Sequence, residues 1–275
     1  MSCGRQFTGG NRLSGVQLWQ EYSQNKQTCK ELAVRYSVSE STIKRHLRGV
    51  MVDFECKDFP LGGTVLMDAT YFGRNWGVVV FMDSKSGKKL WRKYIRHETL
   101  SDYQEGIDLL RRKEYQIKGI VCDGFKGIFN QFSQYPVQMC QRHQIEIIRR
   151  YLTHKPKLEA GIELLFISKQ LTKLSGQEFT ALFEAWEDKW DNFLKERTKD
   201  EQTGKTHFTH KKLRSAWLSL KRTLPHLFVF ENLDGMPNTN NALEGTFTAL
   251  KNRLRNHNGM SKENRKRFID GFLKA

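Results

Sequence analysis

The sequence predicts an α/β protein in which helices cover a mixed β-sheet, with a mostly helical segment after the strands and a small all-α module before them. Three observations lead to this prediction. Short apolar runs at 64–68, 76–81, 89–95, 117–122 and 137–140 have the length and composition of strands, and helical patterns separate the later ones. Residues 14–50 show helical spacing alone. Residues 157–222 are also mostly helical in pattern.

The N-terminal helical segment has the pattern of a helix-turn-helix. Residues 28–48 indicate a short helix at 28–36, a tight turn at 37–39 and a second helix at about 40–48, for which Ser39 is a suitable N-cap. Burying the apolar contact between the two helices leaves an exposed face of Ser41, Thr42, Lys44, Arg45 and Arg48. Such side chains reach phosphates and base edges from a helix in the major groove of DNA. A plain helical hairpin with a basic surface is the alternative.

The sheet segments follow in the order of three strands, helix, strand, helix, strand, helix. A turn-rich segment, DSKSGKK, joins the second and third strands. The first helix is expected at 101–112, with Ser101 as its N-cap and Asp102 in its first turn. Helices near 124–133 and 141–153 follow. Hairpin-linked strands followed by β-α-β crossovers give a mixed sheet in which the first and fourth strands are neighbours.

The composition favours a nucleic-acid partner. The 275 residues include 46 Lys and Arg against 30 Asp and Glu, a formal net charge of +16, and residues 251–275 form the densest positive segment. Such an excess favours a polyanion, although a solvated basic surface is the alternative. The 5 cysteines are odd in number and scattered, which does not indicate a disulfide framework. No apolar run suggests a membrane span or a signal peptide, so we expect a cytoplasmic, nucleoid-associated protein.

Three acidic residues form the candidate catalytic set. Asp68 is expected to close the first strand and Asp123 the fourth, so both would open at the same edge of the sheet. Glu244 lies on a helix expected at 241–256, on the polar stripe beside the buried face. Adjacent carboxylates repel each other and need cations between them, and Mg²⁺ prefers such oxygen ligands. Two Mg²⁺ or Mn²⁺ ions held this way can act on a phosphodiester. The alternative is that each acid is a solvated strand-end or helix-surface charge.

Three segments then match a known family. MDATYFGR, VCDGFKG and NTNNALEGTFTALKNRLRNHNGMS resemble bacterial insertion-sequence transposases related to the eukaryotic Mutator-like group. The resemblance runs over roughly residues 14–275. It implies an RNase H-like catalytic domain at 61–275, with a helical insertion at about 155–230, in which Asp68, Asp123 and Glu244 form the DDE triad.

The resemblance also concerns a Cys-x-x-His pair and the N-terminus. The pair is Cys140 and His143, for which the family implies a role near the active site; a buried Cys with a packed His is the alternative to a metal role. Residues 1–13 open with CGRQF, which looks like half of a zinc-ribbon knuckle, and its partner cysteines are absent. We therefore interpret 1–13 as a remnant of a zinc ribbon that does not bind zinc by itself.

These observations predict a DNA transposase that cleaves transposon ends and transfers the freed strand into target DNA. Its partners would be the terminal inverted repeats and the target DNA, bound by a homodimer or larger assembly. Cations in 251–267 would hold phosphates, with Lys251, Arg253 and Arg255 on the helix of Glu244. The rivals are a non-enzymatic DNA-binding regulator derived from a transposase, and an RNase H-like nuclease that cuts without joining. The sequence leaves open the terminal repeat, the target preference and the pathway of transposition.

Overall fold

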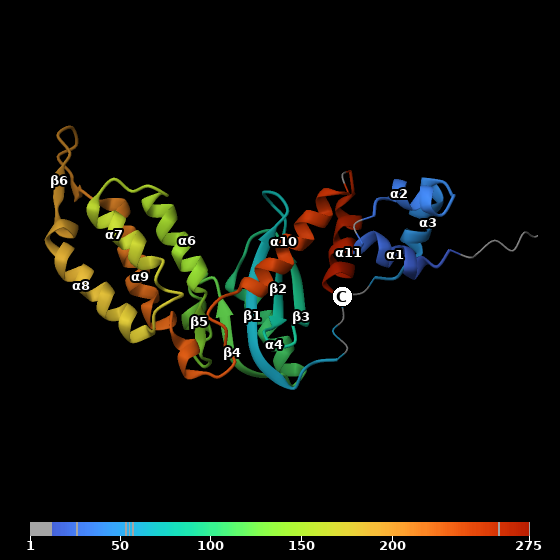
Figure 1. Cartoon of the computed structure of the whole chain (residues 1–275), viewed down its shortest axis with the longest axis horizontal. Coiled ribbons are helices and arrows are strands. Elements are labelled where there is room, and N and C mark those ends of the chain that lie inside the picture. The colour runs from blue at the N-terminus through green and yellow to red at the C-terminus, as the bar shows by residue number, and fades with distance from the viewer. Residues whose placement is uncertain are drawn as a thin grey trace, which may run out of the picture. The chain divides into compact units, whose positions relative to one another are not determined.

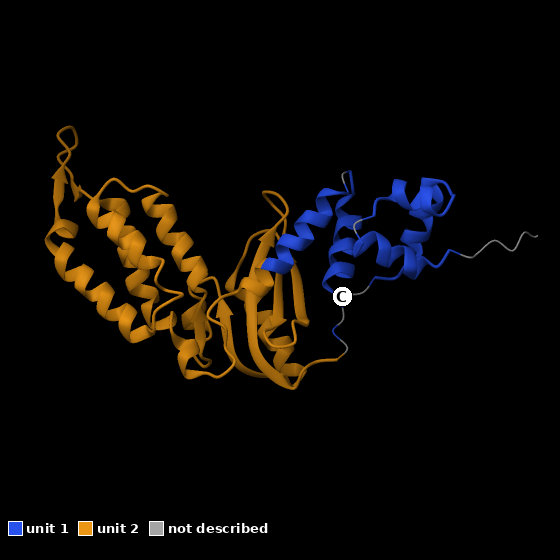
Figure 2. Cartoon of the chain, viewed as in Figure 1, with its two compact units in different colours: residues 1–57, 245–275 blue, residues 58–244 orange. Residues whose placement is uncertain are grey.

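The chain forms two compact units in its computed structural model, which describes residues 13–25, 27–52, 54, 56, 58–257 and 259–274 (Figure 1). Unit 1 combines residues from the first 57 with those of 245–275, and unit 2 spans 58–244; Figure 2 colours them separately. The sequence had instead placed 61–275 in one domain, so the C-terminal helix is grouped differently from the prediction. The proposed zinc-ribbon remnant at 1–13 lies outside the described residues except for Leu13.

Unit 1 begins with α1 (Gly15–Ser23), α2 (Cys29–Arg35) and α3 (Glu40–Gly49). The two helices predicted at 28–36 and about 40–48, with a turn between them, are confirmed as α2 and α3, and the Ser39 hydroxyl accepts the Thr42 N–H at 3.2 Å as the N-cap of α3. Thr28 forms a capping box with Glu31 at the start of α2. A small apolar core joins the three helices, consisting of Leu18, Leu32, Ala33, Ile43 and Leu47.

The last helix, α11 (Lys262–Leu273), belongs to the same unit. A Cβ at Gly271 would lie 2.5 Å from Trp19 Nε1, so this close approach of α11 to α1 requires glycine. Arg267 Nη2 donates to three carbonyl groups at the end of α3, at 3.0 Å, 3.3 Å and 2.7 Å, namely those of Leu47, Arg48 and Val50. Carbonyls at a helix end lack the usual intrahelical donors, although that of Leu47 also accepts the Val50 N–H at 3.3 Å, so Arg267 supplies donors there and holds α3.

Unit 2 contains a five-stranded mixed sheet of order β3-β2-β1-β4-β5. Its strands are β1 (Gly62–Tyr71), β2 (Gly77–Asp83), β3 (Lys89–Ile95), β4 (Gln116–Cys122) and β5 (Val137–Met139). The first three strands pair antiparallel, whereas β1–β4 and β4–β5 pair parallel. The predicted α/β class, the mixed sheet and the adjacency of the first and fourth strands are therefore confirmed.

Two helices of the sheet region differ from the prediction. Helix α4 (Leu100–Arg112) packs on β2, β3 and β4, and its N-cap is Thr99 rather than Ser101. The reason is a capping box, in which Thr99 and Asp102 each accept the backbone N–H of the other. Helix α5 covers only Ile128–Gln131, because Gly124 and Gly127 adopt φ of +80° and +88° and so interrupt the expected helix.

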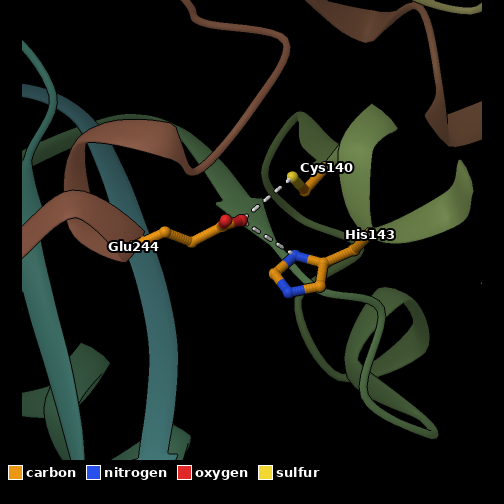
Figure 3. Close-up of side chains that lie close together, drawn as sticks. All are labelled: Cys140, His143 and Glu244. Atoms are coloured by element: carbon orange, nitrogen blue, oxygen red, sulfur yellow. Dashed lines mark hydrogen bonds and ion pairs between the residues drawn. The ribbon is translucent and has the colours of Figure 1, made fainter. Parts of the chain in front are cut away.

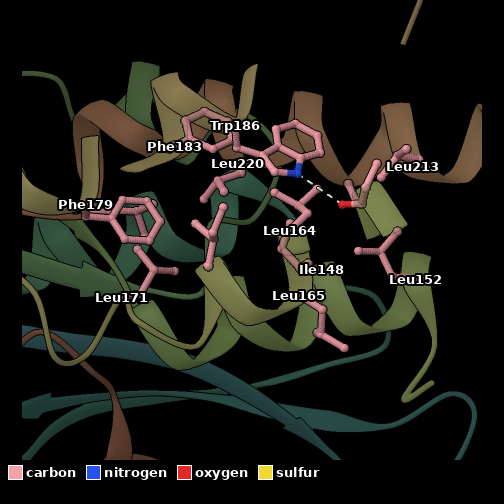
Figure 4. Close-up of a cluster of buried hydrophobic side chains, with 14 of the residues drawn as sticks. Ile148, Leu152, Leu164, Leu165, Leu171, Phe179, Phe183, Trp186, Leu213 and Leu220 are labelled. Carbon is pink, nitrogen blue, oxygen red and sulfur yellow. Dashed lines mark hydrogen bonds between the residues drawn. The ribbon is translucent and has the colours of Figure 1, made fainter. Parts of the chain in front are cut away.

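The predicted insertion at about 155–230 contains α7 (Glu159–Ser168), α8 (Gly176–Lys195) and α9 (Lys211–Thr223), and α6 (Gln141–Leu152), which precedes it, packs against α7 and α9. They enclose a core that includes Phe179, Phe183 and Trp186 (Figure 4). The Trp186 Nε1–H donates to the carbonyl of Ala160 at 3.1 Å, so this tryptophan serves core packing. The hairpin of β6 (Arg197–Lys199) and β7 (Thr206–Phe208) was not predicted, since both strands are short and mostly exposed.

After α9 come two 3₁₀ turns, η1 (Leu224–His226) and η2 (Val229–Asn232), and a loop that leads to α10 (Asn241–Arg255). The first turn of α10, up to Glu244, belongs to unit 2, and the rest of the helix belongs to unit 1. None of the described helices combines the length and apolar character that crossing a membrane requires.

Candidate functional site

Asp68 lies inside β1 and not at its end, which corrects the prediction. The strand continues to Tyr71 because Ala69, Thr70 and Tyr71 still pair with β2. The parallel neighbour β4 stops earlier, at Cys122. Asp68 therefore still lies where the parallel half of the sheet ends, which is where α/β sheets place their binding sites.

The carboxyl group of Asp68 is buried, with 6% of the residue exposed. Its Oδ1 accepts the N–H of Ala69 at 2.8 Å. Burial raises the pKa of Asp68 well above its usual range, and the negative charges of Asp123, Glu244 and Glu98 raise that pKa further. The side chain is thus an acid whose ionisation is opposed by its surroundings in the metal-free protein.

Asp123 directly follows β4, as predicted. In the parallel pairing of β1 and β4, Leu66 lies opposite Val121. The same register two residues further along places Asp68 opposite Asp123. Its Oδ1 accepts the N–H of Phe125 at 3.1 Å, so a local turn fixes the carboxylate. The structure therefore places Asp123, just after β4, level with Asp68 on the neighbouring parallel strand β1.

Glu244 is in the first turn of α10, and its side chain points toward the start of α6 (Figure 3). Its Oε1 lies 3.5 Å from His143 Nδ1 and 4.0 Å from Cys140 Sγ. Cys140 is the N-cap of α6 and is fully buried, whereas His143 and Glu244 have side chains that are 29% and 36% exposed. The glutamate is therefore reachable from solvent, and the thiol lies behind it.

Among the described residues, one group of three metal-ligating side chains has its ligand atoms within 4.8 Å of one another. This group is Cys140, His143 and Glu244. The three predicted carboxylates do not meet that criterion together. Glu244 nevertheless acts on the pKa of Asp68 through its charge. The structure thus brings Asp68 and Asp123 together and turns Glu244 toward the Cys-x-x-His pair.

The loop before α10 positions Glu244, and sequence reasoning missed its anchors. The Asn240 side-chain amide donates to the carbonyl of Met67 at 3.0 Å, and its backbone N–H donates to Cys140 Sγ at 3.3 Å. Gln141 N–H donates to the carbonyl of Asn238 at 3.0 Å. Asn240 is fully buried, so the loop is tied to β1 and to α6 at once. Its place in the polar NTNN segment was the only available signal.

A fourth acid, Glu98, also faces the aspartates and was not predicted. Burial raises the pKa of Glu98 to about 6, with the charge of Asp123 adding to the effect. The Tyr103 hydroxyl donates to Glu98 Oε1 at 2.5 Å and opposes this shift. Glu98 precedes the N-cap of α4, where no periodicity marks it.

The predicted DNA-contacting residues fall into two groups within unit 1. On α3, Ser41, Lys44, Arg45 and Arg48 are exposed as expected, while Thr42 is half-buried and its hydroxyl lies 3.0 Å from that of Ser39. Lys44 forms an ion pair with Glu40 at 3.0 Å. On α10, Arg255 is exposed and Lys251 is half-buried.

Arg253 is engaged within unit 1. Its Nη1 donates to Gln24 Oε1 at 2.6 Å, and its guanidinium lies 4.7 Å from the centre of the Phe272 ring. Arg253 therefore stabilises the packing of unit 1. These contacts explain its position without the predicted contact to a DNA phosphate.

Comparison with known proteins adds no relative, because no family model and no curated protein matches the chain.

Proposed function

We propose that this protein is a DNA transposase of the DDE type, with an RNase H-like catalytic domain in unit 2 and a helix-turn-helix in unit 1. The sheet supports this proposal, since three antiparallel strands followed by two parallel ones, in the order β3-β2-β1-β4-β5, agree with the fold that the resemblance implies. The net charge of +16 and the exposed cations of α3 support DNA as the partner.

The observation that supports the activity most is the pair of Asp68 and Asp123. Two carboxylates on adjacent parallel strands, one of them buried and opposed by neighbouring negative charge, form an unfavourable arrangement without a cation. A divalent cation would remove this cost, and oxygen donors are the ligands that Mg²⁺ and Mn²⁺ take. The residues present therefore fit the metal that the resemblance implies.

Asp68, Asp123 and Glu244 would hold the two ions. Bound ions at such a site activate the attacking water or 3′-hydroxyl and stabilise the leaving oxygen of the phosphodiester. Asp68 is fixed in a buried strand, and Asp123 is oriented by the Phe125 N–H, so the two oxygen donors are preorganised. Glu244 is the adjustable ligand, because a glutamate in the first turn of a helix can change rotamer without moving the backbone.

DNA would be bound by α3, with Arg45 and Arg48 at phosphates or base edges, and by cations of the C-terminal segment such as Arg255. Pairing of two transposon ends requires a dimer or a larger assembly. These contacts position the scissile phosphate at the carboxylates, and the chemistry itself belongs to unit 2.

The test is an assay of cleavage and strand joining. Labelled duplexes that carry the sequences flanking the gene are incubated with supercoiled plasmid, Mg²⁺ or Mn²⁺, and the full-length chain. Wild type is compared with Asp123→Asn and with Asp108→Asn, a control that removes a half-exposed carboxylate of α4. We expect metal-dependent joining in the wild type and in Asp108→Asn, and its loss in Asp123→Asn.

Other outcomes would favour the rival functions. Cleavage without joining would favour a nuclease. DNA binding without either reaction, equal in wild type and Asp123→Asn, would favour a DNA-binding regulator and overturn the proposal.

A further inference from the structure

The Glu244 carboxylate lies beside Cys140 and His143. The sulfur and imidazole of these residues are softer metal ligands than the carboxylates of Asp68 and Asp123. Cys140 Sγ, His143 Nδ1 and a Glu244 oxygen lie within 4.8 Å of one another and converge on one point (Figure 3). Sulfur and imidazole nitrogen are ligands that Zn²⁺ takes and Mg²⁺ avoids. This donor set therefore differs in chemistry from the proposed carboxylate site.

The spacing of the three atoms suits one ion. Around a tetrahedral Zn²⁺, neighbouring ligand atoms are about 3.3–3.6 Å apart, as follows from the usual bond lengths. Here His143 Nδ1 and Glu244 Oε1 are 3.5 Å apart, and Cys140 Sγ and Glu244 Oε1 are 4.0 Å apart. A contraction of a few tenths of an ångström would bring the sulfur and the Glu244 oxygen to this spacing. The ligand atoms of Cys140 and His143, which lie within 4.8 Å of each other, would have to close by up to about 1.2 Å to share one ion, with the fourth corner left for water.

The orientation of His143 gives a second, independent observation. Its Nδ1 is sealed from solvent and has no hydrogen-bond partner among the described residues, although it faces the carboxylate of Glu244. A buried ring nitrogen left in this state costs free energy, and a metal ion would satisfy it. The polar contact that His143 Nδ1 does make is with the Glu244 carboxylate oxygen at 3.5 Å, and it is an ion pair only when the imidazole is protonated.

Burial opposes a thiolate at Cys140 and raises the pKa of the thiol to about 11, but backbone donors partly offset this cost. The backbone N–H of Asn240 donates to Cys140 Sγ at 3.3 Å. The sulfur stands at the N-terminus of α6, a helix of 12 residues whose dipole favours negative charge there. Metal binding would displace the thiol proton to solvent, and these groups would stabilise the resulting Cys140 thiolate.

We propose that Cys140, His143 and Glu244 form a binding site for a thiophilic divalent cation, Zn²⁺ in the first place. Occupation of this site keeps the Glu244 carboxylate at α6 and away from Asp68 and Asp123. It therefore makes Zn²⁺ an inhibitor of the Mg²⁺-dependent reaction; this consequence rests on the proposed function, whereas the site itself does not.

The test of the site uses Co²⁺ as a spectroscopic probe on the metal-free, reduced full-length chain. We expect one Co²⁺ per chain with a thiolate-to-metal charge-transfer absorption that Zn²⁺ abolishes by displacement. Cys140→Ala removes the absorption, and His143→Ala weakens Co²⁺ binding at least about tenfold. The matched controls Cys29→Ala and Cys56→Ala, which change half-buried cysteines elsewhere, retain the absorption.

Two results would overturn the site: no thiolate absorption in the wild type, or an absorption that survives Cys140→Ala. If Cys140→Ala does not fold, His143→Ala decides the matter, because its partly exposed side chain can be removed with little effect on packing. The consequence is tested by the ratio of DNA cleavage with and without Zn²⁺, measured within wild type and within His143→Ala. An equal ratio in the two would refute inhibition through this site. If neither wild type nor His143→Ala cleaves DNA, the proposed function is overturned. The metal site is then judged by the Co²⁺ absorption alone.

Discussion

Replacing Asp68 by Asn should stabilise the metal-free protein at neutral pH. The amide has nearly the same shape and keeps an oxygen that can accept the Ala69 N–H, now 2.8 Å from Asp68 Oδ1. It lacks the charge that burial and the neighbouring acids oppose. A buried acid at the proposed metal site is thus expected to reduce the stability of its own fold, as functional sites often do.

The pH dependence gives this prediction its sign and size. Because the folded pKa of Asp68 lies above the unfolded value of 3.8, the folded state binds more protons than the unfolded state between the two values. The free energy of unfolding then falls as pH rises, by about 1.4 kcal/mol per pH unit for one proton. The free energy of unfolding of Asp68→Asn should therefore exceed that of wild type by an amount that grows at this rate above about pH 4. The difference should become constant above the folded pKa of Asp68.

The measurement is urea unfolding in EDTA at several pH values between about 5 and 8. Asp83→Asn is the matched control, since Asp83 is equally buried in the same sheet but accepts hydrogen bonds from Ser86 and Tyr115 at 2.6 Å. Although burial alone would raise the pKa of Asp83, these bonds lower it below its ordinary value. The stability that Asp83 contributes is therefore present at neutral pH and lost on acidification, so Asp83→Asn should destabilise.

Mg²⁺ provides the second half of the experiment. A ligand that binds only the folded state adds about 2.7 kcal/mol at a concentration of 100 Kd. Wild type should gain this stability and Asp68→Asn should gain less, so that Mg²⁺ narrows the difference between them. The reasoning is wrong if Asp68→Asn destabilises the metal-free protein across the whole pH range, or if its advantage does not change with pH.

Three further predictions concern other parts of the chain. Glu98→Gln should stabilise the metal-free protein by about 1–2 kcal/mol at pH 7 and have little effect near pH 4, because the pKa of Glu98 is raised to about 6; urea unfolding at the two pH values checks this. Phe183→Ala should cost about 3–5 kcal/mol, since the fully buried ring fills the helical core, and the loss would appear in thermal and urea unfolding; a cost below about 1 kcal/mol would contradict the packing. Arg267→Gln should destabilise unit 1 by about 1–2 kcal/mol and weaken DNA binding in fluorescence anisotropy, because three carbonyls at the end of α3 lose the guanidinium and only that of Leu47 keeps a backbone donor, the Val50 N–H; unchanged urea unfolding would contradict this role.

Local pattern was enough to predict much of the fold. The helix-turn-helix was found because its cap, Ser39, and its buried spacing lie within a few residues of each other. The five strands were found because each is a short apolar or, at 89–95, alternating segment, and Asp123 was placed correctly because the fourth such segment ends at Cys122. These signals depend only on neighbours in the sequence.

The errors occur where a distant partner decides the structure. An acid in an apolar strand looks like a strand end, yet β1 runs on past Asp68 because its last residues pair with β2. The N-cap of α4 was placed two residues late, since Thr99 and Ser101 are equally good caps until Asp102 selects Thr99 by a reciprocal hydrogen bond. Glu98 was missed because only burial and the nearby acids of the folded protein raise its pKa, and no local pattern in the sequence marks it.

The position of Glu244 shows why the site as a whole is not readable from local pattern. The residue enters the site through Asn240, whose amide binds the carbonyl of Met67, the residue next to Asp68, across 173 positions of sequence. The same asparagine donates its backbone N–H to Cys140, so one buried residue ties the segment just before Glu244 to both β1 and α6. A change at Asn240 that keeps the fold should therefore disturb the carboxylate site and the Cys-x-x-His site together. Changes at His143 should affect the Cys-x-x-His site more than the carboxylate site. This difference would distinguish Asn240, which positions Glu244, from His143, which competes with the aspartates for the Glu244 side chain.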